Sequence, residues 1–211
     1  MSAKVHKALR LLHEKLDACK ACPNMVGPVV HGPAVVSKIL LIGQAPGPRE
    51  GTFGRPFAWT AGKTLFKWME QATGANEETF RERVYISAVA RCFPGKAFTK
   101  KGVMTGDRRP DEDEIERCGQ YLSREVELLL PDVVLAIGQM AIEAATGHKG
   151  KLDEVIGTVR RTKFHGHELD VIALPHPSGA STWHRTEPGK TLLAKSLALV
   201  SKHPTVKATF A

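Results

Sequence analysis

The sequence predicts an α/β fold in which helices cover both faces of a central, mostly parallel sheet of four strands. Short apolar runs, typical of strands buried on both faces, occur at 38–42, 84–89 and 132–138. Amphipathic segments with helical periodicity alternate with these runs, and this order is typical of parallel strands joined by crossover helices. We therefore expect a three-layer α/β/α architecture.

Length and composition favour one domain without a membrane segment. The chain has 211 residues, of which 42% are hydrophobic, so residues 1–211 can bury one sizeable core and are expected to form a single domain. No stretch reaches the roughly 18 apolar residues of a membrane span, and the N-terminus lacks the apolar core of a signal peptide. We expect a cytoplasmic monomer.

The charge balance favours a polyanionic partner. Thirty Lys and Arg residues against 22 Asp and Glu residues give a net charge of +8 and a pI of about 9.4. Such a balance suits nucleic acid, although a basic protein without a polyanionic partner is the alternative.

The first half of the chain opens with an amphipathic helix. Apolar residues recur at helical spacing from Lys4 to Ala18. The strand at 38–42 then leads into a glycine-rich loop and a helix at 61–71, and the strand at 84–89 leads into a basic run.

The second half continues the alternation of helices and strands. An acidic first turn starts a helix that runs from Pro110 to about Leu130. Two later strands are separated by the polar turn His165-Gly166-His167, whose histidines are typical of an exposed loop. In order, the remaining elements are a strand at 132–138, a helix at 139–146, strands at about 155–160 and 169–174, and a basic amphipathic helix at 188–202.

The loop from Gly43 to Gly62 reads GQAPGPREGTFGRPFAWTAG and is the first candidate site. It lies at a strand-to-helix junction, where α/β folds place ligands. Its glycines allow the backbone to approach a flat ligand closely, and Phe57 offers a ring for stacking. The absence of GxGxxG spacing and of a Gly-Lys-Ser/Thr ending argues against a phosphate-binding loop.

Four cysteines form a candidate metal site. Cys19 and Cys22 make a CxxC, which can bind a metal or act as a redox dithiol. Cys92 and Cys118 complete a set that suits a zinc or iron–sulfur centre. The 69 and 25 residues that separate the last three cysteines match no common zinc-finger spacing. A CxxC with two buried structural cysteines is the alternative.

The run at 91–109 holds six Lys and Arg residues against the single acid Asp107, with Phe93 and Phe98 among them. It suits a loop that faces DNA, and a solvated flexible insertion is the alternative. The candidate phosphate contacts are Lys100, Lys101, Arg108 and Arg109.

His176 lies between two prolines at the end of the last strand. The prolines restrict the backbone, which suits a side chain that must donate a hydrogen bond to developing negative charge. A structural cap or turn is the alternative.

These motifs together resemble the family-4 uracil-DNA glycosylases. The resemblance covers roughly residues 5 to 200 and includes the four cysteines. The matching segments are Gly43-Gln44-Ala45-Pro46-Gly47, Gly54-Arg55-Pro56-Phe57, Ala61-Gly62 and His176-Pro177-Ser178. The resemblance implies a uracil-DNA glycosylase-like fold and a DNA repair enzyme. Such an enzyme flips uracil out of DNA and removes it by hydrolysis, leaving an abasic site.

The resemblance also implies residue roles. Gln44 and His176 would be catalytic, and Cys19, Cys22, Cys92 and Cys118 would hold a structural [4Fe–4S] cluster. The base would be contacted by Gly43, Ala45, Phe57, Ala88 and Ser178. The segment 179–185 would probe the duplex, with Trp183 or Arg185 as its wedge.

Two positions depart from the family pattern. Gln44 stands where the family usually has Glu, and an amide can orient water but cannot act as a general base. Glu50 is an alternative base, although we expect it to be a solvated loop acid. Ala88 stands where the family has an asparagine that reads the pyrimidine edge. The absence of this asparagine predicts a broader range of released bases, which includes hypoxanthine and xanthine.

A related branch of the superfamily traps the sugar covalently through a histidine in a basic loop. Residues 96–109 contain no histidine, so we do not expect covalent trapping. No lysine stands at an obvious nucleophile position, so we expect base removal without strand cleavage. The alternatives are a non-catalytic iron–sulfur protein that binds DNA or senses damage, and an iron–sulfur redox protein or nuclease. A nuclease is disfavoured because the acidic cluster at 111–116 is typical of a helix start.

Overall fold

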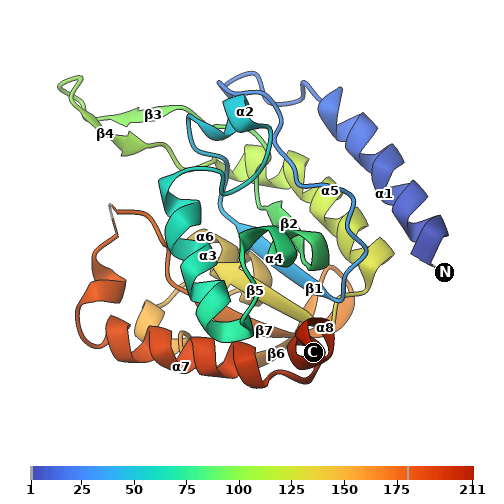
Figure 1. The fold of residues 1–211 in the computed structure, drawn as a ribbon. Helices are drawn as coiled ribbons and strands as arrows, with labels where there is room; N and C mark the ends of the chain where they lie inside the picture. The colour runs from blue at the N-terminus through green and yellow to red at the C-terminus, as the bar shows by residue number, and fades with distance from the viewer. Residues whose placement is uncertain (1, 180) are drawn as a thin grey trace.

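The computed structural model describes residues 2–179 and 181–211. A five-stranded sheet in the order β2-β1-β5-β7-β6 forms the centre of the molecule (Figure 1). The strands are β1 (Ile39–Gly43), β2 (Tyr85–Ala88), β5 (Val133–Ile137), β6 (Val159–Phe164) and β7 (His167–Leu174). β2, β1, β5 and β7 pair in parallel, and β6 pairs antiparallel to β7. The predicted α/β class is confirmed, but the expectation of four strands is wrong.

The fifth strand comes from a tight hairpin. Phe164 pairs with His167, so only His165 and Gly166 form the loop. Both have positive φ, 46° and 83°, as a two-residue type I′ turn requires. This turn reverses the chain onto the outer edge of β7. β6 itself begins at Val159, four residues after the start of the strand predicted at about 155–160.

Side chains on the parallel strands alternate between two cores. Leu40 and Ile42 contribute to one core, and Ile39 and Leu41 to the other. Successive residues of a strand point to opposite faces, so a continuous apolar run supplies both cores.

Helices cover each core. α1 (Ser2–Asp17), α5 (Glu112–Leu129) and α6 (Gln139–Thr146) contribute buried residues to one core. α3 (Thr60–Thr73), α4 (Glu77–Arg83), α7 (Gly189–Lys202) and α8 (Pro204–Phe210) contribute to the other. The predicted three-layer arrangement is confirmed, whereas α4 and α8 were not predicted. Within the described ranges, no helix combines the length and apolarity that crossing a membrane requires.

The basic run forms a hairpin where an irregular loop was expected. β3 (Lys96–Phe98) and β4 (Met104–Asp107) pair antiparallel and project from the body of the molecule (Figure 1). We refer to residues 96–109 as the basic arm. Hydrogen bonds at its tip, from Thr99 N–H to Val103 O (2.8 Å) and from Gly102 N–H to Thr99 O (2.9 Å), define the turn.

A buried ion pair joins α5 to the chain that follows β2. Arg91 and Glu125 are 1% and 0% exposed, and two hydrogen bonds of 2.6 and 2.9 Å link the guanidinium to the carboxylate. Burial alone would raise the pKa of Glu125, but Arg91 outweighs this effect and the pKa is lowered. Both groups are therefore charged in the folded protein.

Neighbouring hydroxyl groups satisfy the remaining hydrogen-bonding capacity of the Glu125 carboxylate. Tyr85 and Ser87 on β2 donate hydroxyl hydrogen bonds to Glu125 (2.8 and 2.9 Å). Because Tyr85 gives its only proton to Glu125, His13 Nε2 must donate to the Tyr85 oxygen (2.8 Å). Burial is the largest of the causes that lower the pKa of His13 to about 4, so this ring is neutral. The network joins α1, β2 and α5.

We expect Glu125→Gln to destabilise the fold by about 3–5 kcal/mol, because it leaves the Arg91 charge buried without a counter-charge. The melting temperature should fall by roughly 10 °C. Glu127→Gln is the matched control on the same helix: its pair with Arg124 is about half exposed, so the loss should stay below about 1 kcal/mol. Equal effects of the two substitutions, measured by denaturant unfolding, would contradict this account.

Candidate functional site

A cavity of about 480 Å³ lies at the carboxyl ends of β1 and β7. The structure brings most of the predicted base-binding residues together there. Both predicted catalytic residues, Gln44 and His176, line the cavity, and so do three of the five predicted base contacts, Ala45, Phe57 and Ser178. The base of the basic arm also lines this cavity, so three segments far apart in sequence enclose one space.

Phe57 is held in an uncommon backbone conformation. Its φ of 54° is in the left-handed region, which costs a non-glycine residue about 1–3 kcal/mol. Arg81 donates to the carbonyl oxygens of Pro56 (3.0 Å) and Phe57 (3.1 Å) and so fixes this turn. The ring lies against the end of β1.

Two glycines make room for this turn. A Cβ at Gly43 would lie 2.7 Å from the Phe57 ring, and a Cβ at Gly62 would lie 1.7 Å from the Phe57 carbonyl oxygen. A side chain at Gly62 would overlap the backbone, and one at Gly43 would displace the Phe57 ring. Gly43, a predicted base contact, lies outside the cavity lining and instead leaves room for the Phe57 ring that lines the cavity.

Glu50 is buried, and the expectation of a solvated loop acid is wrong. It opens the short helix α2 (Glu50–Phe53) and accepts backbone hydrogen bonds from Gly47 N–H (2.6 Å) and Ala58 N–H (3.2 Å). Burial raises the pKa of this carboxyl group, although the backbone donors oppose the shift. Glu50 thus ties the two halves of the glycine-rich loop together at the cavity wall.

His176 presents a defined proton donor. Ser178 N–H donates to His176 Nδ1 (3.2 Å), so the ring proton is on Nε2. Burial lowers the pKa of His176, and the ring is neutral at physiological pH. Gly138, with φ of 82°, leaves space for the ring, because a Cβ there would lie 3.0 Å from His176 Cδ2.

The backbone of the loop continues the sheet past the end of β1. Val89 N–H donates to Gly43 O (2.9 Å), and Ala90 N–H donates to Gln44 O (3.0 Å). Ala88 pairs with Gly43 and is buried, outside the set of residues that line the cavity. The short alanine side chain does not form part of the wall.

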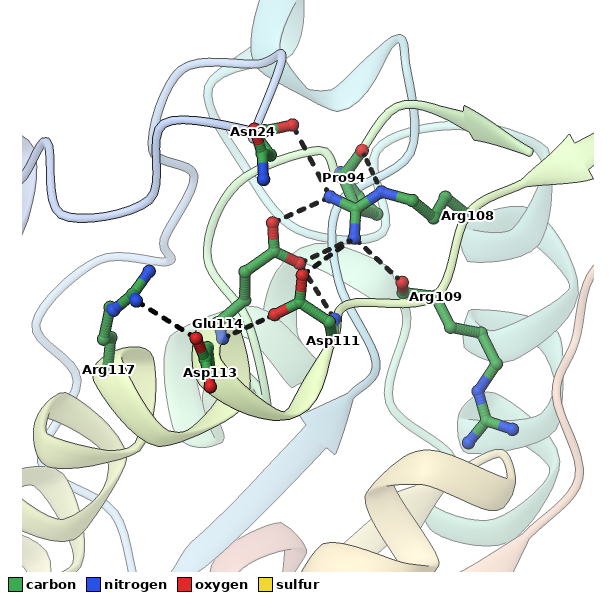
Figure 2. A network of polar contacts seen from close by, with 8 residues as sticks. All are labelled: Asn24, Pro94, Arg108, Arg109, Asp111, Asp113, Glu114 and Arg117. Atoms are coloured by element: carbon green, nitrogen blue, oxygen red, sulfur yellow. Dashed lines mark hydrogen bonds and ion pairs between the residues drawn. The ribbon is translucent and has the colours of Figure 1, made fainter. Parts of the chain in front are cut away.

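Arg108, predicted as a phosphate contact, is engaged in a structural network (Figure 2). Its guanidinium binds Glu114 through two hydrogen bonds (2.7 and 2.8 Å) and donates to Pro94 O (2.9 Å). Glu114 also closes a capping box with Asp111 at the start of α5. Arg108 therefore fastens the base of the arm to α5.

The other predicted phosphate contacts are exposed. Lys100 and Lys101 lie at the turn of the arm, and the side chain of Arg109 points away from the Arg108 network (Figure 2). Arg185 is exposed in a short 3₁₀ helix, whereas Trp183 is partly buried and packs against a core. Ala180, within the predicted probing segment, lies outside the described residues.

The four cysteines line a second cavity, of about 400 Å³. Cys19 and Cys22 follow α1, Cys92 follows β2 and Cys118 lies on α5, and all four are free thiols. Burial raises the pKa of Cys22, and it raises the pKa of Cys92 to about 11.

The donor set of this cavity, four free thiols, is chemically suited to an iron–sulfur centre. Among the residues the structure describes, no three His, Cys, Asp or Glu side chains are grouped closely enough for one metal ion. Zinc would need its sulfur ligands within about 2.3 Å of a common point. An iron–sulfur cluster is larger and binds its thiolates at its periphery, which agrees with four cysteines around an open volume.

Sequence reasoning missed several residues of the site. Arg81 gives no local signal, because it acts on a loop 24 residues earlier in the chain. Gly138 follows a buried strand as Gly43 does, and this parallel position was an available signal. The contribution of Lys96 and Asp107 to the cavity depends on the hairpin.

Comparison with known proteins finds similar sequences among the type-4 uracil-DNA glycosylases. A type-4 uracil-DNA glycosylase from Archaeoglobus fulgidus is 31% identical over 168 residues, 78% of this chain and 75% of the relative. One from Thermotoga maritima is 30% identical over 179 residues, 81% of each chain. One from Sulfurisphaera tokodaii is 28% identical over 180 residues, 82% of this chain and 76% of the relative.

A family model described as the uracil DNA glycosylase superfamily matches residues 29–200, which include the glycine-rich loop and the His176 motif. This match spans most of the chain and includes every residue that lines the base cavity. The chain belongs to the uracil DNA glycosylase superfamily.

Proposed function

We propose that the protein is a monofunctional uracil-DNA glycosylase that extrudes a uracil nucleotide and hydrolyses its N-glycosidic bond. The observation that carries the proposal is the cavity itself, in which a fixed aromatic ring, Phe57, and a neutral donor, His176 Nε2–H, share one space. This pairing suits a flat base that leaves as an anion.

The residues of the cavity would have different roles in base release. Phe57 stacks on the extruded base, and backbone groups near Ala45 bind its polar edge. As the bond between the base and sugar C1′ breaks, the electron pair moves to the base, and His176 donates a hydrogen bond to the oxygen that gains charge. Water adds to C1′ and loses a proton, which neutralises the departed base anion, so that an abasic site and the neutral base remain.

Gln44 would orient this water without removing its proton, because an amide is not basic at neutral pH. Glu50 is a poor substitute, since backbone N–H groups already bind its oxygens. Catalysis would then depend on stabilising the leaving base.

DNA would be bound by exposed cations around the cavity. Lys100, Lys101, Arg109 and Arg185 are exposed, and the chain carries a net charge of +8. Such contacts give sequence-independent affinity that weakens with salt.

Cys19, Cys22, Cys92 and Cys118 would hold a [4Fe–4S] cluster. When bound, the cluster supplies a structural cross-link and no electron transfer to the substrate. These cysteines would join the end of α1 to the segment after β2 and to α5.

The base range would extend beyond uracil to hypoxanthine and xanthine. The basis is Ala88, whose side chain has no group that could read the pyrimidine edge. Ala88 pairs with Gly43 next to the cavity-lining Gln44, and its side chain is too short to join the cavity wall, so it offers the base no contact.

The first test measures base release from end-labelled DNA, single-stranded and duplex, that contains one uracil, hypoxanthine or xanthine. Alkali reveals the abasic sites. We expect His176→Ala to lower kcat by about 10²–10³, the usual effect of losing one oxyanion donor, while the exposed His6→Ala has no effect. No release by brown, cluster-containing protein would exclude an enzyme and favour a non-catalytic DNA-binding role.

The base-range proposal is tested with Ala88→Asn. The new amide should raise the preference for uracil over hypoxanthine about tenfold, as expected for one added base-reading hydrogen-bonding group. Ala88→Val adds volume without hydrogen-bonding groups and separates steric exclusion from recognition. If the unaltered protein strictly prefers uracil and Ala88→Asn leaves this preference unchanged, the proposal is contradicted.

The role of Glu50 is tested with Glu50→Gln. The amide has one accepting oxygen instead of two, so one backbone N–H, of Gly47 or Ala58, loses its partner and the loop around Phe57 shifts. We expect kcat/KM for uracil release to fall at least tenfold. Glu70→Gln, exposed on α3, is the control, and wild-type kcat/KM in Glu50→Gln would refute this role.

A further inference from the structure

The basic arm carries an exposed apolar group that the fold does not explain. Phe98, Val103 and Met104 are 62%, 61% and 59% exposed. Exposed apolar side chains that cluster on one projecting element commonly mark a binding surface. Single exposed residues elsewhere, such as Leu11 on α1, do not form such a group.

The apolar group continues the wall of the cavity. Lys96 and Asp107 line the cavity and are paired across the arm, so they share one face. Phe98 lies two residues beyond Lys96 on the same strand and pairs with Met104. Residues two apart in a strand point the same way, so the Phe98–Met104 pair extends the cavity-lining face outward.

The arm keeps this face in a defined position. The irregular register between Ala97 and Phe98 makes Thr105 an extra residue on β4, which leaves the alternation of β3 intact. At the base, Arg108 fastens the arm to Glu114 and to Pro94 (Figure 2). At the tip, Thr99 accepts a hydrogen bond from Val103 N–H through its hydroxyl (3.1 Å).

The charge around the apolar group matches a nucleic-acid strand. The arm carries five Lys and Arg residues and the single acid Asp107. Lys100 and Lys101 lie at the tip, just beyond Phe98, and both are exposed. Aromatic side chains that stack on bases, flanked by cations that bind phosphates, are the usual composition of a single-strand binding surface.

We propose that Phe98 and Met104 form a stacking platform for the nucleobase next to the extruded nucleotide. The inference rests on the proposed function, because it requires that the cavity receive a nucleotide from DNA. With that nucleotide in the cavity, the neighbouring base has lost one stacking partner, and the platform replaces it. Lys100 and Lys101 then bind the phosphates of the same strand.

Binding is measured by fluorescence anisotropy on single-stranded DNA with one 2′-fluoro-2′-deoxyuridine, whose glycosidic bond resists cleavage. Phe98→Ala should weaken binding about tenfold, the usual effect of losing one stacked base. Phe98→Tyr should retain affinity. Leu11→Ala, an exposed apolar residue on α1, should bind as the unaltered protein does. Unchanged melting temperatures will show that the variants are folded.

Salt dependence and a second probe separate stacking from charge. Phe98→Ala should weaken binding by the same factor at every salt concentration, whereas Lys100→Ala with Lys101→Ala should reduce the slope of log K against log salt. Probes that lack the base on one or the other side of the uracil complete a double-mutant cycle, in which Phe98 and the neighbouring base are removed separately and together. Removal of the stacked base should weaken binding by the unaltered protein about tenfold and by Phe98→Ala hardly at all.

The outcomes distinguish this inference from the proposed function. If the unaltered protein releases uracil and binds the probe, but Phe98→Ala matches it on every probe, only the platform is overturned. If the unaltered protein neither binds nor releases uracil, both proposals are overturned. Additive losses from removing Phe98 and the neighbouring base would also overturn the platform, because the two would then act independently.

Discussion

The Arg91–Glu125 pair is the interaction on which the arrangement of both cavities depends. It is fully enclosed, and its geometry is bidentate, so each charge requires the other. Arg91 also donates from Nε to Ala88 O (2.9 Å), the last residue of β2. Cys92 follows directly, and Glu125 lies two turns beyond Cys118 on α5. One ion pair therefore sets the end of the strand beside the base cavity and the spacing of two cysteines.

The base cavity combines a rigid framework with an unfavourable local conformation. Phe57 adopts a positive φ that its own side chain disfavours, and contacts from Arg81, Gly43 and Gly62 hold it there. Glu50 closes the loop from within. His176 is held in one tautomer by Ser178 and kept neutral by burial. A neutral donor fixed before the substrate binds costs little reorganisation when charge develops on the leaving base.

The sequence was most informative where function imposes local chemistry. The glycine-rich loop and the His176 motif could be identified because their residues are contiguous, and the buried strands because apolar runs are distinctive. The burial of Glu50 could not be predicted, since it depends on how the loop folds around the carboxylate. β6 was misplaced because its residues, VRRTKF, mix charged and apolar side chains at the sheet edge. The strands of the arm are hidden in the sequence for a related reason, because lysines interrupt the alternation that ends in Phe98 and Met104.

The central claim is that base release depends on neutral donors and not on a general base. Gln44 does not titrate, and the lowered pKa of His176 places its titration below the ordinary value of about 6.5. The most direct test is the pH dependence of kcat for uracil release under single-turnover conditions. The account predicts a flat profile from about pH 7 to 9. A rate that rises with pH through this range would reveal a titrating base and contradict the claim.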